Sequence, residues 1–278
     1  MWQILKTSGE NWLAHNDARL GAAIAYYSIF SLGPLLVIAM TVAGLFFGRD
    51  AVETEVSESL GALLGNEGAE AVEDMLAGAS QPSEGGLAAL IGAGALLFAA
   101  IGVVIELKNA LNTIWRVDNA REKGFWRFIR TYILSLAAVV SVGFLLLVSL
   151  TLTATLAAIG TRLAGSLPDG ILQLAGSAAS FLLVTTIFAM IFRFLPDTVV
   201  PWRSVWLGAA ITGVLFELGK LGIGLYIGKL GLESSYGAAA SLVVVLIWVY
   251  YSAQILLFGA ELTHAHATRA SQHQGESA

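Results

Sequence analysis

Residues 234–260 read SSYGAAASLVVVLIWVYYSAQILLFGA and contain no Asp, Glu, Lys or Arg. Four other stretches are also free of charge: residues 20–48, 85–105, 131–161 and 170–192. A sixth, residues 204–228, is interrupted only by Glu217 and Lys220. The hydrocarbon core of a bilayer is about 30 Å thick and requires roughly 20 apolar residues in a helix, so each stretch is long enough to cross it. The sequence therefore predicts an all-α protein embedded in lipid.

The composition supports this fold class independently. Apolar residues make up 56% of the 278 residues and charged residues only 13%, whereas about 25% of a soluble domain is charged. The absence of cysteine excludes disulfides, thiolate catalysis and cysteine-ligated metals. We expect one membrane domain with six transmembrane spans, at about residues 22–47, 86–107, 131–159, 170–192, 204–228 and 238–260.

The basic residues predict how these spans are oriented. In a six-span topology four segments lie on the side of the termini: the one before span one, the connections after spans two and four, and the one after span six. These segments hold eleven of the 15 Lys and Arg residues. Three lie in the opposite connections: Arg49, Arg162 and Lys229. Because Lys and Arg beside a helix resist translocation, both termini are expected in the cytoplasm.

Two connections and the tail carry distinct compositions. Residues 48–85 form an acidic extracytoplasmic loop with apolar residues at helical spacing, which predicts two short helices. This loop is either a solvated cap or a binding face for a cationic partner, and it lacks the ligand spacing of a calcium loop. Residues 108–130 form a basic, aromatic cytoplasmic loop that suits anionic lipid headgroups better than nucleic acid. Residues 264–278 are expected to be a disordered tail rather than a histidine metal site.

Glu217 and Lys220 lie near the middle of the fifth span. Residues three apart share one face of a helix, so each charge can partly neutralise the other. A charge at that depth is costly, and the pair should therefore face protein or water. Two interpretations stay open: an ion pair that fixes the helix register, or a site that binds a substrate or carries a proton.

The cytoplasmic ends of spans two and six carry further polar side chains, which we consider candidates to line a cavity: Glu106, Lys108, Asn109, Asn112 and Glu261. Both helices emerge on the same side in the predicted topology. Glu261 is therefore expected to pair with Lys108 or Arg116 and to lock the inner mouth of the bundle.

Span one contains AAIAYYSIFSLGP at residues 22–34. Its proline deletes a backbone hydrogen bond and its glycine permits a bend, which predicts a kinked helix. The carbonyls released near Phe30 need donors, which the serines of this segment can supply. The candidate gate consists of Tyr26, Tyr27, Ser28, Ser31, Gly33 and Pro34.

These motifs together resemble, in the same order, the YihY/virulence factor BrkB family of bacterial inner-membrane proteins. The resemblance covers nearly the whole chain and is carried by residues 22–34 and 111–115, Glu217 with Lys220 and Tyr226, residues 236–237, Trp248 with Tyr250, and residues 259–261. It implies a six-helix, multi-pass protein of the bacterial cytoplasmic (inner) membrane. It also implies a part in moving envelope lipids or other solutes, and it brings an older label for many members, the tRNA-processing ribonuclease BN.

The residues argue against a ribonuclease. Three of the four histidines lie in the tail, and His15 has only Asp17 near it in the sequence. Neither a phosphate-binding glycine loop with Lys nor a Gly-x-Ser-x-Gly turn is present. We therefore expect no enzyme, no catalytic residues, no metal site, no cofactor and no nucleic-acid partner.

We expect instead a transporter or lipid-translocating protein of the bacterial envelope. Its partners would be membrane lipids and an anionic lipid or solute, and small-residue helix faces would permit a homo-oligomer. The alternative is a non-transporting scaffold or assembly factor that uses the acidic loop.

Overall fold

The computed structural model describes residues 2–48, short pieces between 50 and 74, and residues 101–117, 169–230 and 240–275. All regular secondary structure in these residues is helical, with no strand among them. The predicted span 131–159, most of the predicted span 86–107 and most of the basic loop 108–130 lie outside the described residues.

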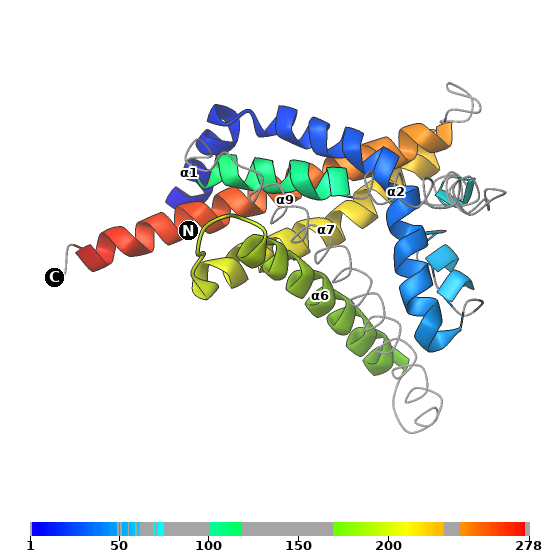
Figure 1. The fold of residues 1–278 in the computed structure, drawn as a ribbon. Helices are drawn as coiled ribbons and strands as arrows, with labels where there is room; N and C mark the ends of the chain where they lie inside the picture. Colours follow the sequence, from blue (N-terminus) through cyan, green and yellow to red (C-terminus); the bar gives the residue numbers. More distant parts are fainter. Residues whose placement is uncertain are drawn as a thin grey trace.

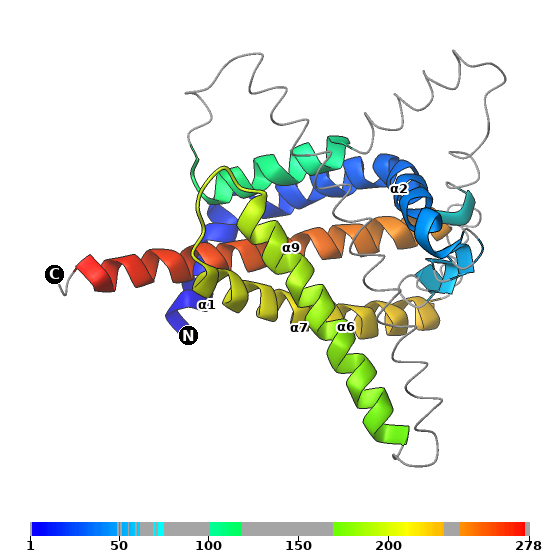
Figure 2. The same cartoon turned by 60° about the horizontal axis from the view of Figure 1, so that its bottom comes forward.

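The longest described helix, α9 (Ala240–Gly275), is the centre of the fold. Around it pack α1 (Trp2–Ala14), α2 (Asp17–Phe47) and α7 (Trp202–Leu230), and α6 (Asp169–Phe194) packs mainly on α7. Residues 101–114 form a further helix, which lies alongside α2 in Figures 1 and 2. The apolar stretches that the structure describes thus form one helical bundle.

Three described helices contain a segment long and apolar enough to cross a membrane: Ser177–Phe194, Trp202–Gly222 and Leu242–Ala270. They coincide with the fourth, fifth and sixth predicted spans. The 31-residue helix α2 contains the first predicted span. The count of six spans and the cytoplasmic placement of the termini stay predictions.

The helices α7 and α9 cross at two glycines. A Cβ atom on Gly208 would overlap the hydroxyl of Thr263, and one on Gly259 would overlap the hydroxyl of Thr212. Each threonine lies four residues after the glycine of its own helix and donates a hydrogen bond to that glycine's carbonyl at 2.8 Å. The two Gly-x-x-x-Thr segments therefore let the two backbones approach closely.

The helix α2 is continuous through Pro34, and its ribbon bends part-way along its length in Figure 1. The bend agrees with the kink predicted from the proline. The buried hydroxyl of Ser31 donates to the carbonyl of Ser28 at 3.2 Å. The hydroxyl of Ser31 therefore binds the carbonyl of Ser28, two residues before Phe30, and not the carbonyl of Phe30 itself.

Described residues of the acidic segment pack on the beginning of α9. Val72 is fully buried against Val245 and Trp248. The hydroxyl of Ser57 donates to the carboxylate of Glu73 at 2.6 Å. This packing is that of a cap on the bundle; the side of the membrane on which it lies stays a prediction.

Residues 264–275 correct one expectation, because they are not a disordered tail but the last turns of α9. Leu262 and Ala265 are buried against Ile4 of α1. The Nδ1 atom of His266 is 2.8 Å from the hydroxyl of Ser204 on α7. The physical reason is that α1 presents an apolar face that must be covered, and the end of α9 covers it.

Candidate functional site

The ion pair predicted on span five is present. The Nζ atom of Lys220 is 2.7 Å from the Oε2 atom of Glu217, and the two side chains are 27% and 33% exposed. The second carboxylate oxygen of Glu217 has no hydrogen-bond partner among the described residues. The pair is thus neither enclosed nor fully open, and the unpartnered oxygen of Glu217 is the buried one of its two carboxylate oxygens.

This pair lies in a groove of about 450 Å³ that follows α7 and is bounded on one side by Phe181 of α6. The remaining lining consists of Val214, Leu218 and Leu221. The two leucines are 56% and 67% exposed, which is what an apolar environment around the bundle would favour. The groove therefore combines apolar walls with two opposite charges.

The crossing of α6 and α7 gives the groove its closed end. At Gly213 an added Cβ would come within 2.6 Å of the hydroxyl of Thr185 and within 3.2 Å of the ring of Phe181. Glu217 follows Gly213 by one helical turn and so lies just beyond this contact. Figure 1 shows α6 and α7 diverging along their length, and the side chains of Lys220 and Glu217 are partly exposed.

A second polar site lies at the end of the bundle near the chain termini. The Nζ atom of Lys108 is 2.9 Å from the carboxylate of Asp197. Asn112 donates to the same carboxylate at 3.0 Å and accepts the backbone N–H of Asp197 at 2.8 Å. Because Lys108 and Asn112 are buried, this network fixes helix 101–114 to the segment that joins α6 and α7.

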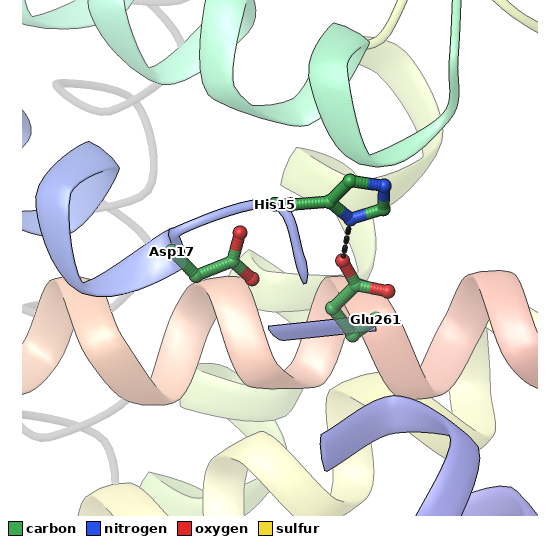
Figure 3. A group of neighbouring side chains, drawn as sticks. All are labelled: His15, Asp17 and Glu261. Carbon is green, nitrogen blue, oxygen red and sulfur yellow. Dashed lines mark hydrogen bonds and ion pairs between the residues drawn. The ribbon is translucent and has the colours of Figure 1, made fainter. Parts of the chain in front are cut away.

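A third group consists of His15, Asp17 and Glu261, called here the carboxylate cluster. His15 lies in the turn between α1 and α2, Asp17 is the first residue of α2, and Glu261 lies on α9. The turn is made by Asn16, which adopts a left-handed conformation with φ 56°. Figure 3 shows the turn presenting both side chains towards α9, with His15 Nδ1 2.6 Å from Glu261 Oε1.

Asp17 is fully buried, and neither of its carboxylate oxygens has a hydrogen-bond partner among the described residues. Burial, and secondarily the negative charge of Glu261, raises the pKa of Asp17 to about 7. The residue precedes the predicted first span. Its carboxyl therefore holds a proton near neutral pH unless a cation compensates its charge.

The predicted pairing of Glu261 with Lys108 is wrong, since Lys108 binds Asp197 and Glu261 binds His15. Arg116 acts on Glu261 only through its electrostatic field. Lys108 and Asn112 come together, whereas Asn109 is exposed and Glu106 is half-buried outside this network. The five polar residues predicted to line one cavity therefore do not form one site in the structure.

The candidate gate residues divide into two sets. Tyr26 and Tyr27 are 60% and 45% exposed, and Tyr26 forms edge-to-face contacts with Tyr27 and Phe30. Ser31 and Gly33 are buried. The helix α2 packs mainly on α9, and no ion pair or hydrogen bond joins a described gate residue to Glu217. The gating role stays a prediction.

Sequence reasoning missed His15, Asp17 and Asp197. In the sequence the first two are only neighbours in the chain, and no motif marks the third. One signal was available: Asp197 falls on the same predicted side as Lys108. The expectation of no metal site rested on spacing along the chain, and the structure instead joins His15 and Asp17 to Glu261 across 244 or more positions.

Comparisons with known proteins agree with a membrane protein. A sequence profile of the virulence factor BrkB family matches residues 10–278. The chain is 30% identical over 273 residues to a UPF0761 membrane protein of Verminephrobacter eiseniae, covering 93% of this chain and 60% of that protein. It is 29% identical over 265 residues to a UPF0761 membrane protein of Ralstonia nicotianae, covering 93% of this chain and 56% of that protein.

A third relative, a UPF0761 membrane protein of Stenotrophomonas maltophilia, is 30% identical over 270 residues, which cover 92% of this chain and 59% of that protein. The chain therefore spans less than two thirds of the length of these relatives. No solved structure matches it.

Proposed function

We propose that this chain, a member of the virulence factor BrkB family of membrane proteins, binds an envelope amphiphile in the α6–α7 groove. The protein then moves the amphiphile across the bacterial cytoplasmic (inner) membrane. The family membership that the sequence motifs predicted is confirmed by the profile match. The activity is translocation rather than covalent catalysis. The amphiphile is a phospholipid or another molecule with an anionic or zwitterionic headgroup.

One observation carries this proposal: two opposite charges lie in a groove whose other walls are apolar. Lys220 can exchange its partner for a phosphate or carboxylate oxygen, and the Oε2 atom of Glu217 that Lys220 releases can then accept a hydrogen bond from an ammonium group. A zwitterionic headgroup would satisfy both. Acyl chains would then lie against Leu218 and Leu221.

The position of the pair along α7 supports a step within the membrane. Glu217 lies 15 residues after the first residue of α7 and 13 before its last, or about 20 Å from either end at 1.5 Å per residue. A headgroup at that depth needs charged partners, since an isolated charge in hydrocarbon is costly. The ion pair compensates the protein's own charges until a headgroup replaces one partner.

The test is translocation of fluorescent phospholipids in liposomes that contain the purified protein, with quencher added outside. Glu217→Gln and Lys220→Met should each slow translocation by about tenfold or more, because losing one charge-assisted hydrogen bond costs about 1.5–3 kcal/mol. The matched control is the exposed pair of α1, Lys6 and Glu10, 3.8 Å apart. Lys6→Met and Glu10→Gln should leave the rate unchanged.

Two results would contradict the proposal. One is an unchanged rate in well-folded Glu217→Gln and Lys220→Met proteins. The other is a wild-type rate equal to that of protein-free liposomes under every lipid composition and proton gradient tried. Either would favour the scaffold hypothesis, in which the ion pair only maintains packing.

A further inference from the structure

We propose that the carboxylate cluster, His15, Asp17 and Glu261, binds one divalent first-row transition-metal ion. Each residue offers one ligand atom, and these atoms lie within 4.8 Å of one another. The inference is independent of the amphiphile groove, because the cluster lies at the α1–α2 turn and on α9, whereas the groove lies along α7.

The burial of the acids is the first observation behind this proposal. Asp17 and Glu261 are both 0% exposed. Both carboxylate oxygens of Asp17 have no hydrogen-bond partner among the described residues, whereas the carboxylate of Glu261 is held by His15 and by the side chain of Asn11. Buried polar atoms are normally partnered, and an orphaned buried acceptor requires an explanation such as an ion. Figure 3 shows the carboxylate of Asp17 directed towards Glu261.

Charge is the second observation. Two ionised carboxylates would carry a charge of about −2, of which the contact with His15 can offset at most one and which a divalent cation would neutralise. Among the described groups, Arg116 acts electrostatically on Glu261 and on the nearby His264, but its side chain is exposed. A cation bound between the two carboxylates would compensate their negative charge directly, whereas Arg116 acts on Glu261 only from a distance.

The donor set selects the class of ion. One imidazole nitrogen with two carboxylate oxygens suits zinc, manganese, iron or cobalt, whereas calcium and magnesium take oxygen ligands almost exclusively. Bonds of about 2.1 Å place ligand atoms roughly 3–4 Å apart. His15 Nδ1 and Glu261 Oε1 are 2.6 Å apart, which is a hydrogen-bond distance. A metal ion would take the place of the proton between them, so these two atoms would move slightly apart while Asp17 closes in. Bound metal would tie the α1–α2 turn to α9.

The experiment uses the full chain without a histidine tag, purified in detergent and stripped with a chelator. Manganese and zinc are added separately, the bound metal is counted by elemental mass spectrometry after gel filtration, and thermal unfolding is followed in parallel. Cobalt absorption spectra report nitrogen and oxygen ligation. The variants are Asp17→Asn and Glu261→Gln, and the control is Glu10→Gln, an exposed acid on α1.

We expect about one metal ion per wild-type chain, a higher unfolding temperature with metal, and at least about a tenfold weaker affinity in each cluster variant. Glu10→Gln should behave as wild type. Metal-free Asp17→Asn should unfold no earlier than metal-free wild type, because the change replaces a buried carboxyl group that has no hydrogen-bond partner among the described residues. A merely structural carboxylate would show the opposite, a loss of stability without any metal dependence.

The proposal is overturned if wild type binds no more metal than Asp17→Asn. It is overturned equally if metal binds to both cluster variants as to wild type, which would place the ion elsewhere, for instance on the histidines at the end of α9. Should one variant fail to fold, the other and the cobalt spectrum of wild type still decide.

Discussion

Substituting Gly208 by alanine should destabilise the bundle, whereas the same change at Gly222 of the same helix should not. An added Cβ at residue 208 would overlap the hydroxyl of Thr263 and lie 2.8 Å from the carbonyl oxygen of Gly259. The hydroxyl is held by its own hydrogen bond and the carbonyl belongs to the backbone, so α7 and α9 must move apart. Overpacking of this kind costs about 1–3 kcal/mol.

The control substitution, Gly222→Ala, should change the stability in the opposite direction. Gly222 is exposed, and no described atom lies within 4 Å of a Cβ built there. Alanine at that position should stabilise the helix by about 0.5–1 kcal/mol because it reduces backbone entropy in the unfolded chain. The same gain offsets part of the cost at residue 208, so Gly208→Ala should lose about 1–2 kcal/mol net.

The assay is reversible unfolding in mixed detergent micelles, followed by tryptophan fluorescence at increasing denaturing detergent. The double change Gly208→Ala with Thr263→Ala should recover part of the loss, since it removes the overlapping hydroxyl but not the carbonyl contact. Equal effects of alanine at residues 208 and 222 would refute the close crossing of α7 and α9.

Two further predictions concern contacts at the end of the bundle near the termini. Lys108→Met should lower the free energy of unfolding by about 3 kcal/mol, because it removes the buried partner of Asp197. Asp197→Asn should cost much less in the Lys108→Met background than in wild type. Additive losses in this double-mutant cycle would show that the two residues are not paired. Leu262→Ala should cost about 2–5 kcal/mol, as Leu262 is fully buried beneath α1, while an effect near zero in the same unfolding assay would mean that the end of α9 is not docked.

Local features of this fold could be predicted from the sequence because they depend on the solvent and on helix geometry alone. Charge-free stretches predict helices in lipid since hydrocarbon offers no hydrogen bonds to the backbone. The pairing of Glu217 with Lys220 follows from a spacing of three residues within one helix. A bend in the first span is predicted from one proline, and the ribbon of α2 bends part-way along its length.

Contacts between distant segments could not be predicted in the same way. Charge counting assigns Lys108, Asp197 and Glu261 to one side of the membrane but does not say which helices are neighbours there. Lys108 therefore had two acidic partners available, and the rotation of α9 decided between them. The carboxylate cluster depends likewise on one left-handed residue, Asn16, which turns His15 and Asp17 towards the same helix.

The most direct measurement of the central claim is photo-cross-linking from within the groove. In one protein a photoreactive amino acid replaces Leu218, which lines the groove. In the control protein it replaces Leu182, which is 62% exposed on α6 and does not line the groove. Both proteins are placed in liposomes of mixed headgroup composition. If the groove selects headgroups, adducts at residue 218 are enriched in one headgroup class and Lys220→Met abolishes this enrichment. Adducts at residue 182 then follow the bulk composition throughout. Adducts at residue 218 that mirror the bulk lipids, with or without Lys220, would contradict this selection.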